Sequence, residues 1–387
     1  MRAVAFLTAV LLLSSSLMAQ DYSGTSPSKV RHGQLSLNGY FKDMPSLSFY
    51  RGGEMEWSNI LQNRLNFSYR NRQFRLAIEL RNRMLSGDMV TDYGPFLEEM
   101  LKTDNGLVDA SFVPFSNKNV MMHSNFDRFF IDWRSNNWQI RAGRQRINWG
   151  LNTVSNPNDL FNTYSFFDVD YEERPGADAI RVQYFTGDLS RIELAIAPQE
   201  KSKESVAAVM YAFNTSGYDL QFIAGYYRHK LAVGTGWAGH IKNSGFKGEL
   251  TVFNGLEDQD SLVLVGAFSV DHLFGNGIYG MVEVLYNGGH KGFDPDLLML
   301  MEPMSADNIF ISKYAVTATA MYPISPLFSA SLAGMYMPDI SGYYIGPNLS
   351  YSLLTNLDVS LLAQYFSLND ADIPEMLAVY AQLKWSF

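Results

Sequence analysis

Arginine side chains are concentrated in one part of the chain. Eleven of the eighteen arginines fall between Arg64 and Arg146, together with only two lysines. A guanidinium group makes planar, bidentate contacts with carboxylate or phosphate, which suits the binding of small anions. A second role, compatible with the first, is to pair with Glu79, Asp132, Glu193 and loop acids and so stiffen the structure. The candidate solute-binding residues are Arg64, Arg75, Arg81, Arg128, Arg141 and Arg181.

Two long segments carry the opposite charge. Residues 86–110 hold six acidic residues against one lysine, and residues 156–176 hold five against one arginine. One interpretation is that they are solvated loops, bridged to lipopolysaccharide by divalent ions. The other is that one or both fold inward and face the arginines, which would set a transverse field across a narrow pore. For that arrangement the candidate constriction acids are Glu98, Glu99, Asp159 and Asp170.

The elements that would position these side chains are strands, because apolar and polar residues alternate along the chain. At the C-terminus, Phe387, Trp385 and Leu383 share one face, whereas Ser386 and Lys384 share the other. Alternation over about ten residues is what a strand needs to cross a bilayer between lipid and a polar interior. A charge that faces lipid at the bilayer midplane costs about 2–4 kcal/mol, so the arginines are expected to face inward.

The alternation predicts an all-β fold, a transmembrane antiparallel β-barrel of eighteen strands, with sixteen as the alternative. Short turns join the strands in pairs and longer segments separate the pairs, which is typical of short periplasmic turns and long extracellular loops. The expected strands cover residues 33–43, 59–70, 73–84, 125–135, 138–148, 177–186, 189–198, 205–214, 217–228, 231–241, 245–254, 261–272, 276–287, 312–322, 326–337, 342–352, 356–367 and 376–387.

The N-terminal nineteen residues have the features of a secretory signal peptide. Arg2 precedes an apolar run at residues 4–13, three serines follow, and Ala19 offers a small residue for cleavage. An uncleaved anchor helix is the alternative. Residues 20–32 are then expected to be a periplasmic segment, and residues 33–387 to be the barrel. The chain has no cysteine and a net charge of −9, which argues against a lipoprotein and against a general nucleic-acid binder.

Two loops of the expected barrel have helical features, and its second half is more apolar than the first. Pro95 fits the first turn of a helix over residues 96–102, and Asp294 can cap a helix that includes residues 297–301. Residues 262–268 are apolar on both faces. This half of the barrel is therefore expected either to be covered by loops or to form a conduit for hydrophobic solutes.

Other motifs lack the context that their chemistry requires. Two G-x-G-x-x-G matches, which begin at Gly234 and Gly275, are not followed by an expected helix, so no nucleotide site is expected. The six histidines have no metal-ligand spacing, and the chain has no G-x-S-x-G. No cofactor, metal site or catalytic residue is therefore expected, although isolated Ser and His residues leave a barrel-embedded enzyme open as an alternative.

The chain resembles the porin-like β-barrels of Gram-negative outer membranes. Phe387 at the end of the last strand is similar to the C-terminal signature of that group, which implies that the barrel-assembly machinery reads it. Residues 143–150 followed by 156–161 resemble the G-[RK]-Q…W-G…N-P-x-D pattern of porin-like families and, more loosely, of alginate-export-type porins. Arg144 and Arg146 in this stretch are out of phase with the inward arginines, so either a bulge re-aims them or they lie above the membrane.

These features predict an outer-membrane channel, not an enzyme, for passive diffusion of small polar or anionic solutes. One alternative is a FadL-like transporter of hydrophobic solutes, which the apolar second half favours. Another is a structural or assembly barrel that transports nothing. The expected partners are outer-membrane lipid and lipopolysaccharide, the barrel-assembly machinery and small solutes. A homo-oligomer stays open, and no nucleic acid is expected.

Overall fold

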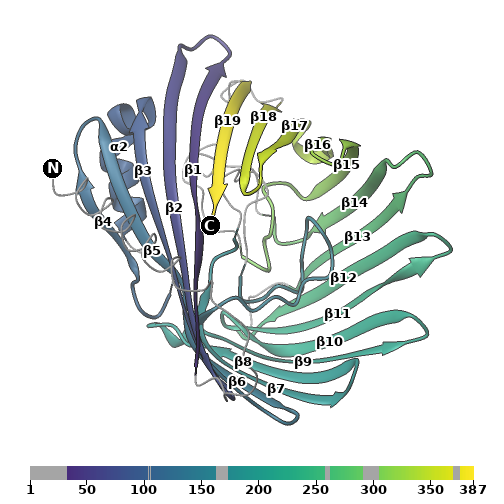
Figure 1. Ribbon diagram of the computed structural model, residues 1–387. Helices are drawn as coiled ribbons and strands as arrows, with labels where there is room; N and C mark the ends of the chain where they lie inside the picture. The colour runs from purple at the N-terminus through teal and green to yellow at the C-terminus, as the bar shows by residue number, and fades with distance from the viewer. Residues whose placement is uncertain are drawn as a thin grey trace, which may run out of the picture. The chain divides into compact units, whose positions relative to one another are not determined.

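The described residues of the computed structural model form one antiparallel β-sheet that closes into a barrel (Figure 1). The barrel belongs to the unit Leu35–Phe387. Within the described ranges, no α-helix has the length and apolar character that crossing a bilayer requires. The predictions for residues 1–19, for residues 20–32 and for the helix after Asp294 lie outside those ranges. The structure describes residues 33–102, 104, 106–162, 173–257, 262–290, 305–368 and 375–387.

Eighteen strands form the wall, as the alternation predicts. Pairing of the first strand with the last closes the barrel. A further short strand, β4 (Ser111–Ser116), runs beside β5 at its outer end, whereas β3 and β5 pair directly and continue the wall. The wall strands are β1 (Gln34–Tyr50), β2 (Met55–Asn71), β3 (Phe74–Gly87), β5 (Val120–Ser135), β6 (Trp138–Gln145), β7 (Ala177–Gly187), β8 (Ser190–Ala197), β9 (Val206–Thr215), β10 (Tyr218–Tyr227), β11 (Lys230–Ile241), β12 (Ser244–Gly255), β13 (Val263–Leu273), β14 (Tyr279–Asn287), β15 (Tyr314–Ser325), β16 (Phe328–Met337), β17 (Gly342–Leu354), β18 (Leu357–Ser367) and β19 (Met376–Ser386).

Side chains alternate between the two faces of the wall. On β8, Ile192, Leu194 and Ile196 are each more than 40% exposed, whereas Glu193 and Ala195 between them are at most 1% exposed. The apolar face therefore points outward and the polar face inward, as period-two alternation dictates. The same phase puts the arginines of β2 to β8 on the inner face.

The helix after β3 begins earlier than the sequence predicts. Helix α2 spans Asp88–Lys102, so Pro95 lies within the helix and not in its first turn. The start of the helix depends on a tertiary contact: Ser58 Oγ on β2 accepts a hydrogen bond of 3.1 Å from the Met89 N–H, one of the free amide groups of the first turn. Two short 3₁₀ turns, Ser202–Glu204 and Pro338–Ile340, lie in other loops.

Helix α2 packs on the inner side of the wall near its outer end. Its Val90 forms a small buried cluster with Leu85 of β3 and Met121 of β5. Leu85 has the same phase on β3 as Arg81 and Arg83, which places the helix on the face that carries the arginines.

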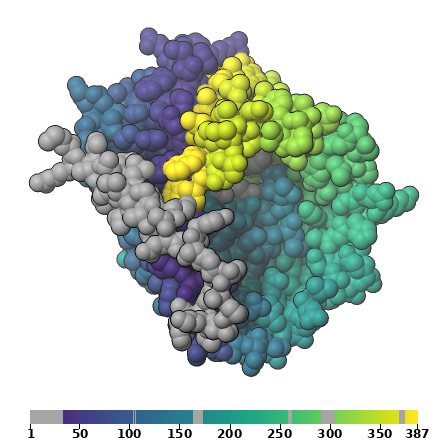
Figure 2. Space-filling view, viewed as in Figure 1, coloured from purple at the N-terminus to yellow at the C-terminus, as the bar shows by residue number. Residues whose placement is uncertain are grey.

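Part of the barrel interior is filled by residues 146–162, which we call the inward segment (Figure 1). It follows β6 and runs over the inner faces of β8 to β14. Its Ile147, Trp149 and Leu160 are at most 3% exposed and belong to one apolar cluster with inner-face residues such as Phe253 and Val265. The space-filling view shows the remaining hollow between the C-terminal strands, in yellow, and the green and teal strands (Figure 2).

The C-terminal residue takes part in closing the barrel. The Phe387 N–H donates to the Gly39 carbonyl at 3.0 Å, and the Gly39 N–H donates to the Phe387 carbonyl at 3.1 Å. The Phe387 ring lies 5.9 Å from the ring of Phe41 on β1 and 5.5 Å from that of Trp385 on β19. Phe387 therefore extends the seam between the first and last strands by one pair.

Deleting Phe387 is expected to weaken this seam and slow assembly. The change removes two backbone hydrogen bonds, each of which contributes about 0.5–1.5 kcal/mol, and two aromatic contacts. We expect less protein in the outer-membrane fraction and unfolding at a lower temperature, measured by heat-modifiable gel mobility. Phe387→Tyr, which keeps the ring and the backbone, is the control. A native protein found soluble in the periplasm, with none in membranes, would contradict the barrel.

Candidate functional site

The candidate arginines lie on neighbouring strands of the wall. We call this inner face of β2, β3 and β5 to β8 the arginine wall. In the strand register Arg64 stands directly opposite Arg81, and Arg141 stands opposite Arg181. Like charges at such short separation repel, so the arrangement requires carboxylates nearby. The six residues are Arg64 on β2, Arg75 and Arg81 on β3, Arg128 on β5, Arg141 on β6 and Arg181 on β7.

Asp127 is the carboxylate that lies between Arg64 of β2 and Arg81 of β3. It forms an ion pair with Arg64, and its other oxygen lies 3.6 Å from Arg81 Nη2. The β3–β5 register shifts at this point, between Glu79 and Leu80, as it does at a β-bulge. A bulge re-aims a side chain, which explains how Asp127 faces inward beside Arg128. Asp127 could not be predicted from the sequence, because strict alternation cannot place two consecutive residues on one face.

Arg128 binds the chain after the inward segment. Its guanidinium donates to the carbonyl of Asp127 at 2.8 Å and to the carbonyl of Arg174 at 2.6 Å. It also lies 3.7 Å from the Glu173 carboxylate. Arg128 is 4% exposed, so its main contacts are with the protein itself.

The arginines of β6, β7 and β8 surround two further carboxylates, those of Asp132 and Glu193. Arg141 Nε donates to Asp132 at 2.9 Å, and its guanidinium lies 4.3 Å from the centre of the Phe130 ring. Arg181 and Arg191 both contact Glu193, at 3.7 and 3.4 Å.

The acids of the wall do not match the arginines one for one. Arg64 contacts both Asp127 and Glu79, whereas Arg181 and Arg191 share the single carboxylate of Glu193. Arg75 lies 5.8 Å over the Phe130 ring and forms no ion pair with any described residue. Among the described residues, Arg181 and Arg191 therefore have one carboxylate for two positive charges and Arg75 has none, which leaves an excess of positive charge on this face.

The inward segment is held by carboxylates of the opposite wall through its own backbone. Glu249 on β12 accepts hydrogen bonds from the N–H groups of Leu151, Asn152 and Asn158, at 2.5, 2.6 and 3.0 Å. Glu283 on β14 accepts two more, from residues 154 and 155. Hydrogen bonds from amides to a carboxylate are stronger than those between neutral groups. These acids therefore anchor the segment and are not free in the lumen.

The G-x-Q…W-G…N-P-x-D stretch owes its pattern to this packing. Trp149 Nε1 donates to Glu193 at 2.9 Å, and its ring meets Phe161 edge-on with 5.0 Å between centres. Asn158 Oδ1 accepts a hydrogen bond of 2.6 Å from the Thr251 hydroxyl. Gly143 has φ +114°, and a Cβ there would lie 2.3 Å from the Phe129 carbonyl, so only glycine fits.

Arg144 serves a different purpose from the inward arginines. It donates to both Asp178 oxygens at 2.8 Å and also binds Asp104 and the Val108 carbonyl. It thereby ties the connection between α2 and β4 to β7. Arg146, the first residue of the inward segment, has a buried Nε with no hydrogen-bond partner among the described residues.

The four candidate constriction acids lie in different surroundings. Glu98 and Glu99 are on α2, where Glu98 pairs with Lys102 at 3.0 Å. Asp159 is 2% exposed and 3.4 Å from Arg174. Burial raises the pKa of the Asp159 carboxyl to about 7, although Arg174 and Arg146 act in the opposite direction. Asp170 lies outside the described residues.

The apolar inner face of β13, in the second half of the barrel, is covered by loops. Val263, Val265 and Ala267 on the inner face of β13 are at most 9% exposed. They pack in one cluster with the inward segment and with Phe310, in the chain that leads into β15. Among the alternatives that the sequence left open, cover by loops is the one observed for these strands.

Comparison with solved structures identifies the architecture. Acinetobacter baumannii OccAB4 superposes with a TM-score of 0.60 at 7% sequence identity, over 94% of this chain and 100% of that one. OccAB2 of the same organism gives 0.58 at 10% identity, over 91% and 98%. Pseudomonas aeruginosa OpdQ gives 0.55 at 8% identity, over 91% and 98%. No family model and no curated protein matches the sequence.

The protein has the fold of an outer-membrane porin. Its closed barrel of eighteen strands is the one found in porins of the OccD/OprD group, to which these solved structures belong. The resemblance to porin-like barrels expected from the sequence is thus confirmed for the fold.

Replacing Glu249 with alanine is expected to release the inward segment. Three buried N–H groups would lose their acceptor, at a cost of about 3 kcal/mol or more. We expect faster proteolysis within residues 146–162 in detergent and a larger, noisier conductance in planar bilayers. The control is Glu257→Ala, on an exposed loop where the carboxylate contacts Lys203. Unchanged protease resistance and unchanged conductance in Glu249→Ala would show that Glu249 does not anchor the segment.

Proposed function

We propose that the protein is an outer-membrane channel through which small polar solutes diffuse, with a preference for anions. The observation that carries this proposal is the excess of positive charge among the described residues of the arginine wall, where Arg181 and Arg191 share Glu193 and Arg75 forms no ion pair. The excess positive charge lines the inner face of a closed barrel with a porin fold. Charge on a pore wall attracts ions of the opposite sign.

The Ser–His contacts of the described residues support a channel over a barrel-embedded enzyme. Arg83 donates to His123 Nδ1 at 3.0 Å, so the ring proton lies on Nε2 and is donated to Ser111 Oγ at 2.7 Å. A general base needs a free lone pair on the nitrogen that faces the hydroxyl. The His272 ring, 3.0 Å from Ser244 Oγ, has no carboxylate partner among the described residues.

The packing of β13 supports polar over hydrophobic transport. A FadL-like route along this side would need its apolar inner residues to meet the solute, whereas they are covered by the inward segment. As in the porin fold generally, we propose lipid and lipopolysaccharide as neighbours of the outer face and the assembly machinery as a partner of Phe387.

Replacing Arg75 with glutamine is expected to shift selectivity toward cations. In water, a unit charge about 8 Å from a permeating ion contributes about 0.5 kcal/mol, which corresponds to about a twofold change in permeability ratio. We would measure the reversal potential across a planar bilayer in a salt gradient, where the effect should shrink at high ionic strength. Arg51→Gln, in the exposed connection between β1 and β2, is the control. A wild type that is strongly cation-selective, with no change in Arg75→Gln, would contradict the anion preference.

A further inference from the structure

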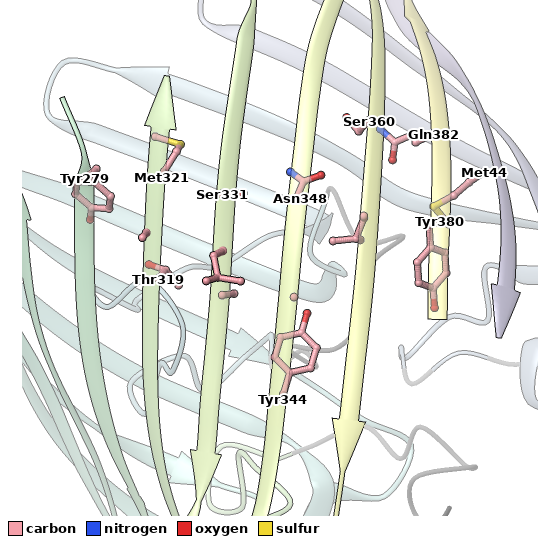
Figure 3. A pocket seen from close by; sticks show the side chains of 15 residues that line it. Met44, Tyr279, Thr319, Met321, Ser331, Tyr344, Asn348, Ser360, Tyr380 and Gln382 are labelled. Carbon is pink, nitrogen blue, oxygen red and sulfur yellow. The ribbon is translucent and has the colours of Figure 1, made fainter. Parts of the chain in front are cut away.

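The inner face of β14 to β19 and β1 carries a pocket that contains no charged side chain (Figure 3). Its volume is about 490 Å³, which lies in the ordinary range for small-molecule sites. Three tyrosines, Tyr279, Tyr344 and Tyr380, line it together with Asn348 and Gln382. The pocket is therefore chemically different from the arginine wall.

The strand register brings the lining into one continuous row. Each member stands directly opposite the next on the neighbouring strand, from β14 across to β19. The row has a tyrosine at each end, an apolar side chain next to each tyrosine and two polar side chains at its centre, so one surface offers ring faces, apolar groups and hydrogen-bonding groups. Its members are Tyr279, Met321, Ser331, Asn348, Leu362 and Tyr380.

Several polar groups of the pocket are not used by the protein itself. The side chains of Thr319, Ser331, Asn348 and Gln382 make no hydrogen bond to any described residue. Hydroxyl and amide groups both donate and accept. The carboxylates and most guanidinium groups of the arginine wall, in contrast, are already engaged with one another.

The Tyr344 ring is held in place as a surface within the pocket. The Gln364 amide donates to the Tyr344 hydroxyl at 3.3 Å. The side chain lies back over Gly346 on its own strand, where an added Cβ would come within 2.3 Å of the Tyr344 hydroxyl. The absence of a side chain at Gly346 thus leaves room for the ring, and Figure 3 shows it below Asn348.

We propose that this pocket binds a neutral polyhydroxylated solute, a sugar or polyol, during its passage through the barrel. Such a solute presents hydroxyl groups to amides and hydroxyls, and apolar C–H faces to aromatic rings. An ion would lose hydration there without a charged lining group to replace it. The inference rests on the proposed channel function, because it names a solute class for the uncharged side of the same lumen.

Current block by maltose in planar bilayers tests the proposal. We expect maltose to reduce the ion current with saturation, and Asn348→Leu or Gln382→Leu to raise the half-blocking concentration about tenfold, because hydrogen bonds to the solute are lost. Asn348→Gln, which keeps the amide, should retain most of the block. Gln73→Leu, in the turn between β2 and β3, is the matched control and should behave like the wild type.

The outcomes separate this inference from the channel function. If ions pass but maltose does not block, or blocks the wild type and Asn348→Leu equally, the pocket proposal fails and the channel stands. Gluconate block with the same dependence on Asn348 would also overturn the preference for a neutral solute. If no current is observed, calorimetric titration of the detergent-solubilised protein with maltose shows whether the pocket binds the sugar. Binding that Asn348→Leu abolishes supports the pocket without the channel, and absence of binding overturns it.

Discussion

The contact between the Glu249 carboxylate and three backbone N–H groups decides which part of the inner surface a solute can meet. Glu249 and Glu283 draw the inward segment over β8 to β14, and the segment buries the apolar inner face of β13 beneath it. What is left open is the arginine wall on one side and the uncharged strands on the other. Both proposed solute interactions depend on this division, because an uncovered β13 would offer a third, hydrophobic surface.

Much of the fold could be predicted from the sequence, because a membrane barrel imposes one rule on every strand. Lipid on one side and a polar interior on the other force a period of two, and a one-residue slip would put arginine into lipid. The strand number and the inward phase of residues such as Arg64 and Arg141 follow from that rule alone. The first two strands extend further than expected, to Tyr50 and from Met55, where the alternation no longer marks their ends.

The partners of the candidate site could not be predicted, because they depend on contacts between distant parts of the chain. Glu249 lies about a hundred residues from the amides that it binds, and nothing in the local pattern around either links them. Asp127 depends on a bulge that breaks the period. No local pattern indicates that Asp159 is buried with Arg174, since a charged residue in a long loop is ordinarily solvated.

The way in which the inward segment is attached has a consequence for variation and engineering. Five of its bonds to Glu249 and Glu283 use main-chain amides, which every residue except proline possesses. Side chains of the segment that point away from the wall are therefore free to be exchanged while the anchor persists. Substitutions confined to the inward segment could therefore change the width of the lumen, or give it a new chemical lining for a sensor, while the strands of the barrel stay unchanged.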